Sequence, residues 1–572
     1  MASNPDRPSR WFESTVQLGM FSQLKRSAIF SVFVALLFLV RGLGIQCLYP
    51  PLEGPDEYQH IAYLAYLKEH HALPTFDKAT VPKSMYPDLV ANPHCIYDCK
   101  ETGKIGCLDY SEFYERGPQA PGAATIGLYE AQQAPLYYVL FAPVYGWVKE
   151  AFGFRQAIYT LRSINIALAA LGIVLLASPL RGVFRDESLI RLGILAVSLL
   201  PMFMTYVSRV SCDALAMAFA GLAVHGLTRM NSHRHLPLNA AIVGGLIGLG
   251  VLTKLIVICL LPVTLLFITY LALMAKLPRR DAVVCAVAVI GGYLLFAGYY
   301  HCQNYHRYGT SVAYNETIWN TGASKTPFDV ARQIQLKQIR FVFLDVLMRS
   351  NLWTSGGSFL FPCPFLASAY RRLLDIALLG VVPGLVMFLF RSRATGRMPV
   401  PPNLVLCGLI TVSAFLMVYG QCLNSIVLYG YMVTLPYYVM IGYPAFLICI
   451  LAAARGYGRG GALTASLAMI ILFLSVEYYC VLGVAVEHWA NAADPRVIYR
   501  RLASVHPVFP SPAFYLPMAV IVCFMATVLL RASFVARDPV PLAGGARGET
   551  APGSDGRQID AQLSDSPAAR LD

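Results

Sequence analysis

The sequence predicts an all-α, polytopic membrane protein of about twelve transmembrane helices. Hydrophobic residues make up 56% of its 572 residues and charged residues only 13%, whereas about a quarter of the residues in an ordinary soluble domain are charged. Apolar stretches long enough to cross a bilayer recur from Ser27 to Arg531. Because such a chain cannot cover itself with polar surface, we expect one continuous membrane domain over residues 27–531.

The basic residues give a formal net charge of +13 and lie in short clusters between apolar stretches. This distribution follows the positive-inside rule and leaves no basic face for the phosphates of a nucleic acid. We therefore expect no nucleic-acid partner and place every cluster in a cytoplasmic loop. The clusters lie within residues 181–191, 229–234, 276–280, 391–397 and 455–459.

Residues 1–26 are predicted to be a cytoplasmic N-terminus, because Lys25 and Arg26 directly precede the first apolar run. That run, 27–49, is too long for a signal peptide and lacks a small-residue cleavage site, so we expect a retained anchor. Residues 532–572 lack apolar periodicity, which is typical of a disordered tail, here cytoplasmic. The remaining spans are expected near residues 160–180, 188–207, 211–228, 238–253, 254–275, 282–300, 372–390, 402–420, 431–453, 462–483 and 512–530.

This topology leaves two large segments outside, about residues 50–159 and 301–371. Within the first, the apolar stretch from Pro135 to Trp147 contains two prolines and is short for a span. We predict an interfacial or re-entrant helix there, on the outer face. Thr253 and Lys254 interrupt a later apolar run, so we expect the chain to turn at that point.

Cysteines in the first outer segment point to an oxidising compartment. Cys95, Cys99 and Cys107 lie close together in sequence and predict a disulfide among them. A metal site that adds His94 is an alternative, although its spacing matches no standard zinc pattern. Unpaired structural cysteines are the third possibility.

The candidate chemistry directly follows the first span. Two prolines and a glycine turn the chain as it leaves the membrane and place Asp56 and Glu57 at the interface. On a helix that begins near Pro55, His60 shares a face with both carboxylates. Partial desolvation suits a carboxylate to general-base catalysis, and adjacent carboxylates can also hold a divalent cation. The alternative is that both merely cap the following helix.

The sequence EGPDEYQHIAYLAYLKEHHALP, residues 53–74, resembles a motif of the membrane glycosyltransferases of fold type C, in which Pro-Asp-Glu-x-x-His and a distal Leu-Pro follow the first helix. It is most similar to bacterial predicted membrane proteins related to protein mannosyltransferases and aminoarabinose transferases. Further elements resemble this group in the same order, over about residues 27–309. They are EAQQAPLYYVLFAPVY with Gln133 and Tyr137, LRSIN with Arg162, LPMFMTYVSRVSCDALA with Asp213, GLIGLGVLTKLIVICLLP with Lys254, and NYHRYGT with Asn304 and Tyr308.

The resemblance implies a multi-pass enzyme of a bacterial inner membrane. Such an enzyme takes a sugar from a polyprenyl-phosphate carrier and delivers it, on the outer face, to a lipid, glycan or protein acceptor. Asp56 would be the general base that deprotonates the acceptor hydroxyl, and Glu57 would position that base or the acceptor. The other motif residues would contact substrate: His60, Gln133, Tyr137, Arg162, Asp213, Lys254, Asn304 and Tyr308.

Arg162 and Lys254 would neutralise the departing lipid phosphate, since Arg makes bidentate contacts and Lys supplies a point charge. The alternative for both is that they reach toward lipid headgroups. The sequence departs from the family pattern at Gln133 and Ala134, where the family has His and Pro. It departs again at residues 429–431, Tyr-Gly-Tyr ahead of Leu435-Pro436, where many members have Gly-Arg-Tyr. These departures imply either a different donor or lost activity.

Two other classes of protein remain open. A lipid or polysaccharide transporter, or flippase, would also have many spans and broken helices. Transporters often show two similar halves and ionisable groups near the middle of the bilayer. This sequence has no such halves, and its polar clusters lie at the outer ends of spans. A non-catalytic partner in envelope glycan assembly is the remaining alternative.

Overall fold

In the computed structural model, the described residues belong to one compact unit, Met1–Ala536. They are residues 10–54, 56–93, 109–117, 125–230, 236–274, 276–313, 315–320, 326–332, 336–352, 364–394, 400–431 and 439–535. His94, Cys95, Cys99 and Cys107 lie outside these ranges, so the disulfide and the alternative metal site stay predictions. The same holds for the tail beyond residue 535.

Regular structure in the described ranges is helical, and the strand-like pairing within them is an isolated bridge between Thr80 and Gly127. The first part of the chain forms α1 (Arg10–Gln46), α2 (Glu57–His70), η1 (Lys83–Met85), α3 (Tyr86–Val90), α5 (Tyr110–Arg116), η2 (Tyr129–Gln132), α6 (Leu136–Phe152) and α7 (Phe154–Leu176). The middle part forms α8 (Leu180–Val183), α9 (Glu187–Ser198), α10 (Pro201–Val207), α11 (Asp213–Thr228), α12 (Leu236–Val251), η3 (Leu255–Cys259), α13 (Leu260–Leu273) and α14 (Arg279–Tyr308). The last part forms α15 (Asn315–Trp319), α16 (Pro327–Ala331), α17 (Leu336–Leu352), α18 (Pro364–Ala394), α19 (Pro402–Tyr429), α20 (Tyr443–Gly456), α21 (Arg459–Cys480), η5 (Val481–Ala485), α22 (Val486–Ala490), α23 (Pro495–Val505), η6 (Pro512–Phe514) and α24 (Tyr515–Val535).

Within the described ranges, seven helical segments are long and apolar enough to cross a membrane, and α9 with α10 makes an eighth if this bent pair counts as one span. Shorter apolar helices lie in α11, α12, α18 and α20. Each span expected from hydropathy overlaps one of these segments, although residues 432–438 of the span expected at 431–453 lie outside the described ranges. The overlap confirms the all-α, multi-pass membrane class. The α9–α10 pair bends by 44° where α10 begins at Pro201, which has no N–H with which to continue α9.

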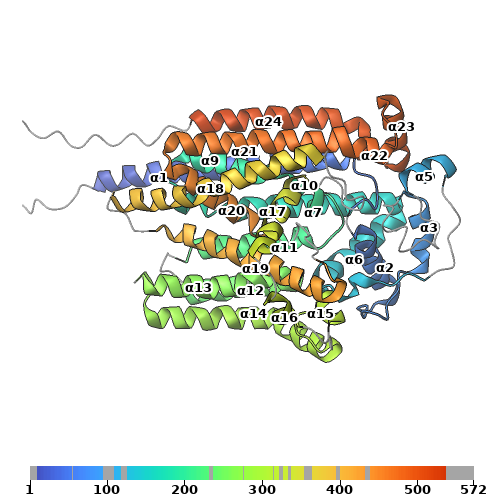
Figure 1. Cartoon of the computed structure of the whole chain (residues 1–572), viewed down its shortest axis with the longest axis horizontal. Coiled ribbons are helices and arrows are strands. Elements are labelled where there is room, and N and C mark those ends of the chain that lie inside the picture. The colour runs from blue at the N-terminus through green and yellow to red at the C-terminus, as the bar shows by residue number, and fades with distance from the viewer. Residues whose placement is uncertain are drawn as a thin grey trace, which may run out of the picture. The chain divides into compact units, whose positions relative to one another are not determined.

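Figure 1 shows the long helices running side by side, with α2, α3, α5 and α6 gathered at one end of them. These short helices all come from the segment between α1 and α7 that the sequence placed outside the membrane. Helix α23, from the late segment near residues 495–505, lies at the same end. The polar residues of the site lie in and beside this group of short helices.

The break predicted at Thr253 and Lys254 is confirmed, because it falls between α12 and η3. Lys254 itself has an extended backbone (φ −152°, ψ 126°). The stretch predicted to be an interfacial helix forms α6, which contains Pro143. The backbone N–H of Leu136, at the start of α6, donates to the carbonyl of Leu252 over 2.9 Å. The outer segment is thereby joined to the broken span.

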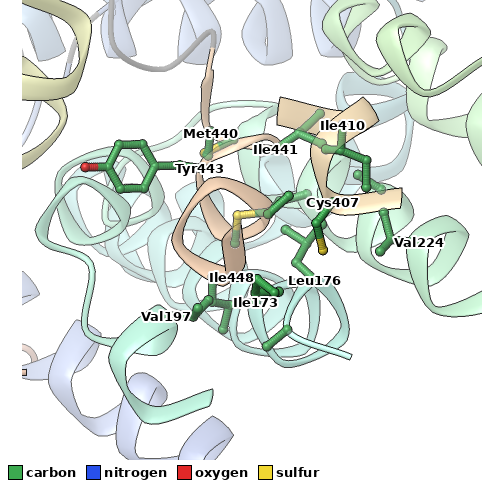
Figure 2. Packing of buried hydrophobic residues seen from close by; sticks show 14 of the residues in the cluster. Ile173, Leu176, Val197, Val224, Cys407, Ile410, Met440, Ile441, Tyr443 and Ile448 are labelled. Carbon is green, nitrogen blue, oxygen red and sulfur yellow. The ribbon is translucent and has the colours of Figure 1, made fainter. Parts of the chain in front are cut away.

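Small residues let some helices approach closely. A Cβ on Gly244 of α12 would lie 2.0 Å from the carbonyl oxygen of Val289 in α14, and one on Gly292 would lie 2.1 Å from that of Ala241. Close backbone contact of this kind is typical of membrane helices, which gain little from hydrophobic burial against each other. Elsewhere, α7, α9, α11, α19 and α20 interdigitate larger side chains, including Ile173, Leu176, Val197, Val224, Cys407, Ile410 and Ile448 (Figure 2).

Candidate active site

Asp56 stands at the head of α2 in the left-handed backbone region, with φ 56° and ψ 12°. Few residues other than glycine adopt this conformation, and aspartate tolerates it better than most. Its side chain makes no capping hydrogen bond to α2. Instead, its Oδ1 accepts a 2.5 Å hydrogen bond from the hydroxyl of Tyr129 on η2. Helix capping therefore does not explain the Asp56 carboxylate.

Glu57, the next residue, is fully buried and forms a two-pronged ion pair with Arg162 of α7. Arg162 Nε lies 2.8 Å from Glu57 Oε1, and Nη2 lies 2.5 Å from Oε2. The backbone N–H of Val210 also donates to Oε1 (2.7 Å), and that of Gly54 donates to Oε2 (3.2 Å). Both carboxylate oxygens are therefore engaged by groups of the protein itself.

Arg162 uses its remaining donors on the segment that leaves α1. Nη1 donates to the carbonyl of Tyr49 (2.8 Å) and Nη2 to that of Pro50 (2.7 Å). The rings of Tyr49 and Tyr159 lie 5.1 and 5.0 Å from the guanidinium carbon, within cation–π range. Arg162 is fully buried, and its hydrogen bonds join α7 to the segment that follows α1. It therefore does not reach toward a lipid headgroup.

A divalent cation shared by Asp56 and Glu57 does not fit this arrangement. A metal ion at Glu57 would have to displace the Arg162 guanidinium or a backbone amide from the carboxylate. In the part of the chain that the structure describes, no group of three or more His, Cys, Asp and Glu side chains could hold a metal ion. The residues present thus disagree with the cation that the adjacent carboxylates suggested.

Asp213, at the start of α11, joins two buried cations. Its Oδ1 lies 2.5 Å from Lys254 Nζ, and its Oδ2 lies 2.7 Å from Arg209 Nη2 and 3.0 Å from Ser211 Oγ. Asp213 is fully buried, and the side chains of Arg209 and Lys254 are 2% and 7% exposed. Because two cations share one carboxylate, this trio carries a net positive charge.

The segment that carries Arg209 is held in place from α7. Asn165 Nδ2 donates to the carbonyls of Arg209 (2.7 Å) and Ser211 (3.1 Å). The hydroxyl of Tyr137, on α6, donates to Asn165 Oδ1 over 3.2 Å. Tyr137 therefore supports the segment of Arg209 through Asn165. The position of Arg209 thus depends on α6 and α7 as well as on its own segment.

His60 lies one turn into α2, but its hydrogen-bond partner is not a carboxylate. Its Nδ1 lies 2.7 Å from the hydroxyl of Tyr138, whose ring stacks on that of Tyr63 at 3.8 Å. Burial, and then the positive charges of Arg209 and Lys254, hold the pKa of His60 well below its usual range. The imidazole is therefore neutral at pH 7.

Three residues that the sequence analysis did not single out belong to this site: Tyr129, Glu130 and Arg209. Glu130 is buried on η2, close enough to Asp56, Lys254 and Arg209 for their charges to act on it. The backbone N–H of Gln133 donates to the backbone carbonyl of Glu130 over 3.0 Å. Arg209 had a signal in the sequence, because it precedes Asp213 by four residues within an apolar stretch. Glu130 had a weaker one, as an acid ahead of a proline break.

We call Asp56, His60, Glu130, Arg209, Asp213 and Lys254 the polar cluster; their charges act on one another. The end of α14 flanks it. The hydroxyl of Tyr300 donates to the carbonyl of Gln132 (3.4 Å). The hydroxyl of Tyr308 accepts from the backbone N–H of Phe76 over 3.3 Å. Tyr308 therefore lies against the first outer segment, and Asn304 is buried one turn before it on α14.

The Tyr-Gly-Tyr sequence of residues 429–431, where the family that the motifs resemble has Gly-Arg-Tyr, lies at the end of α19. Tyr429 and Tyr431 are exposed, and their rings stack at 5.8 Å. Leu435 and Pro436, which follow in the family pattern, lie outside the described residues.

No protein-family model and no curated protein matches the chain. Among solved structures, it is similar to the Archaeoglobus fulgidus oligosaccharyltransferase, with 13% identity over 85% of this chain and 57% of that chain and a TM-score of 0.44. It is also similar to ArnT from Cupriavidus metallidurans, with 15% identity over 89% of this chain and 74% of that chain and a TM-score of 0.40. The first is by name a transferase of sugars, the broad class that the sequence motifs resemble. Likeness at this level carries no argument about activity, which has to come from the site.

Proposed function

We propose that the chain is a membrane glycosyltransferase. It moves a sugar from a polyprenyl-phosphate carrier to a lipid, glycan or protein acceptor, with Asp56 as the general base. The proposal combines the family resemblance of the sequence motifs with the geometry of the polar cluster. The main observation behind the proposal is the environment of Asp56. Its carboxylate makes no capping hydrogen bond to α2, and it lies near the net positive trio of Arg209, Asp213 and Lys254.

This environment suits both the deprotonation of the acceptor and the departure of the lipid phosphate. The acceptor hydroxyl must lose a proton as it attacks the anomeric carbon, and Asp56 is the carboxylate that would take that proton. The bond between the anomeric carbon and the phosphate oxygen breaks at the same time, which leaves negative charge on the lipid phosphate. Arg209 and Lys254 supply positive charge in a buried setting, where it stabilises that developing charge more strongly than in water. Attack from the side opposite the leaving group inverts the anomeric carbon.

The other candidates have supporting roles in this proposal. Glu57 and Arg162 position Asp56, because their ion pair fixes the chain on both sides of it. Tyr137 holds the segment of Arg209 through Asn165. His60, Gln133, Asn304 and Tyr308 would line the place where sugar or acceptor binds.

We also propose the inner membrane of a bacterium as the location, with both chain termini in the cytoplasm and the polar cluster on the outer face. The basic clusters between the spans support this orientation through the positive-inside rule. Cysteine-accessibility labelling at Asp77 and Arg279 should place the two positions on opposite sides of the membrane. Labelling of both from one side would contradict the orientation.

A transfer assay tests the proposal. The purified protein in lipid vesicles would be given a panel of undecaprenyl-phosphate-linked sugars and a membrane extract as acceptor. We expect labelled sugar to move to an acceptor, with inverted anomeric configuration and release of undecaprenyl phosphate. Movement of the intact carrier across the vesicle bilayer with no bond broken would contradict it and favour a flippase.

A further inference from the structure

Glu130 is a buried carboxyl that the reaction proposed above does not use. It lies on η2, is 6% exposed, and its Oε2 has no hydrogen-bond partner. A buried acceptor without a partner costs free energy, so such an atom in a folded protein calls for an explanation. The neighbouring Tyr129 donates to Asp56, so the same turn of helix presents both a partner of Asp56 and the carboxyl of Glu130.

The surroundings of Glu130 determine its charge. The titratable groups that act on it or feel its charge are Asp56, Tyr138, Arg209, Cys212 and Lys254. Burial, and then the negative charge of Asp56, raise the pKa of Glu130 to about 8, against the opposing effect of Lys254 and Arg209. Glu130 therefore carries a proton at pH 7, and its carboxyl can act as a hydrogen-bond donor.

An ion-pair role does not account for this carboxyl. Lys254 and Arg209 are both bound by Asp213, at 2.5 and 2.7 Å. A protonated Glu130 carboxyl adds no further negative charge near Arg209 and Lys254. If Glu130 were ionised instead, it would repel a phosphate brought to those cations.

We propose that Glu130 is a second acid–base residue of this site, the proton donor to the lipid phosphate that leaves. This proposal rests on the proposed function. The neutral carboxyl of Glu130 first donates a hydrogen bond to a phosphate oxygen of the bound carrier. As the bond between the anomeric carbon and the phosphate oxygen breaks, the proton of Glu130 passes to the phosphate, and the proton of the acceptor hydroxyl passes to Asp56.

The proton balance closes within the site. After transfer, Asp56 is protonated, Glu130 is ionised and the product is a singly charged lipid phosphate. Passage of one proton from Asp56 to Glu130 then restores the starting state, with no co-reactant. Because the starting state needs a proton on Glu130, phosphate binding and turnover should both weaken as the pH rises through about 8.

The Glu130→Gln variant tests this proposal, because an amide keeps the size of the side chain but cannot give up a proton in this way. Glu115→Gln, at an exposed glutamate on α5, is the matched control. Infrared difference spectra should show a protonated carboxyl in the native protein at pH 7 that titrates away near pH 8. The Glu130→Gln variant should lack that signal, and the control should keep it.

Binding of undecaprenyl phosphate in phosphatidylethanolamine and phosphatidylglycerol nanodiscs gives a second readout. Affinity of the native protein should fall by up to about tenfold per pH unit above pH 8, and that of Glu130→Gln should stay flat. Turnover of Glu130→Gln at pH 7 should fall by about a hundredfold or more. Absence of the carboxyl signal, or native turnover in Glu130→Gln alongside active native protein, would overturn the role of Glu130 alone. Failure of the native protein both to bind undecaprenyl phosphate and to transfer sugar would overturn the proposed function as well.

Discussion

Two groups of buried charge lie side by side in this molecule and differ in the ratio of their cations to their anions. Glu57 and Arg162 form a one-to-one pair, with the remaining donors of the arginine on backbone carbonyls. The trio of Arg209, Lys254 and Asp213 has one more cation than anion. We propose that the first group holds the chain in place, whereas the second takes part in substrate binding.

A second pair inside the helix bundle follows the pattern of Glu57 and Arg162. Arg41 of α1 donates to both carboxylate oxygens of Glu477 on α21, over 2.7 Å from its Nε to Oε1. Its other donors reach the carbonyls of Ser198 (2.8 Å) and Leu199 (3.0 Å), where α9 ends. Arg41 thereby satisfies backbone groups that the break before Pro201 leaves without partners. A buried pair whose arginine donors all reach protein acceptors, like Arg41 with Glu477, is typical of a structural role.

The largest effect that the comparison predicts is on folding. Arg162→Met leaves Glu57 as an unpaired buried charge and should lower the free energy of unfolding by about 3–5 kcal/mol. Arg116→Met, which breaks the exposed pair with Glu112, is the control and should change it by less than about 1 kcal/mol. The free energy of unfolding of both variants can be measured by denaturation in detergent. Equal stability of the two variants would remove the distinction between the groups.

The next effect concerns phosphate binding. Lys254→Met removes one cation of the trio, while Arg209 continues to pair with Asp213. We expect affinity for undecaprenyl phosphate to fall by about ten- to a hundredfold, the range for loss of a charged hydrogen bond. Lys78→Met, at an exposed lysine of the first outer segment, serves as the control. Native affinity in Lys254→Met would show that the trio does not bind the carrier.

The smallest effect tests the orientation of Asp56. Tyr129→Phe removes the 2.5 Å hydrogen bond to Oδ1 and should lower turnover by about three- to tenfold, with little change in folding. Tyr114→Phe removes a hydroxyl that bonds the carbonyl of Arg501, away from the polar cluster, and should leave turnover unchanged. A loss of the same size in both variants would mean that Tyr129 has no particular role in turnover.

Much of the fold was predictable because hydropathy and the positions of charged residues are local properties of the sequence. The break at Lys254 followed from a lysine within an apolar run, and α6 followed from a short stretch with two prolines. The pairing of Glu57 with Arg162 was not predictable, because 105 residues separate them and only packing brings them together. The burial of Glu130 likewise depends on the fold around η2, so the proline that follows it in the sequence was only a weak signal.

The central claim is that Asp56 acts in the reaction and contributes little to the stability of the fold. Paired measurement of turnover and unfolding in Asp56→Asn tests it most directly, because asparagine keeps the shape and tolerates the left-handed backbone. Asp77→Asn is the matched control, since Asp77 is exposed and also has a positive φ, 63°. We predict that turnover of Asp56→Asn falls by about a hundredfold to ten-thousandfold, with a free energy of unfolding within about 0.5 kcal/mol of the native protein. Near-native turnover in Asp56→Asn would contradict the claim.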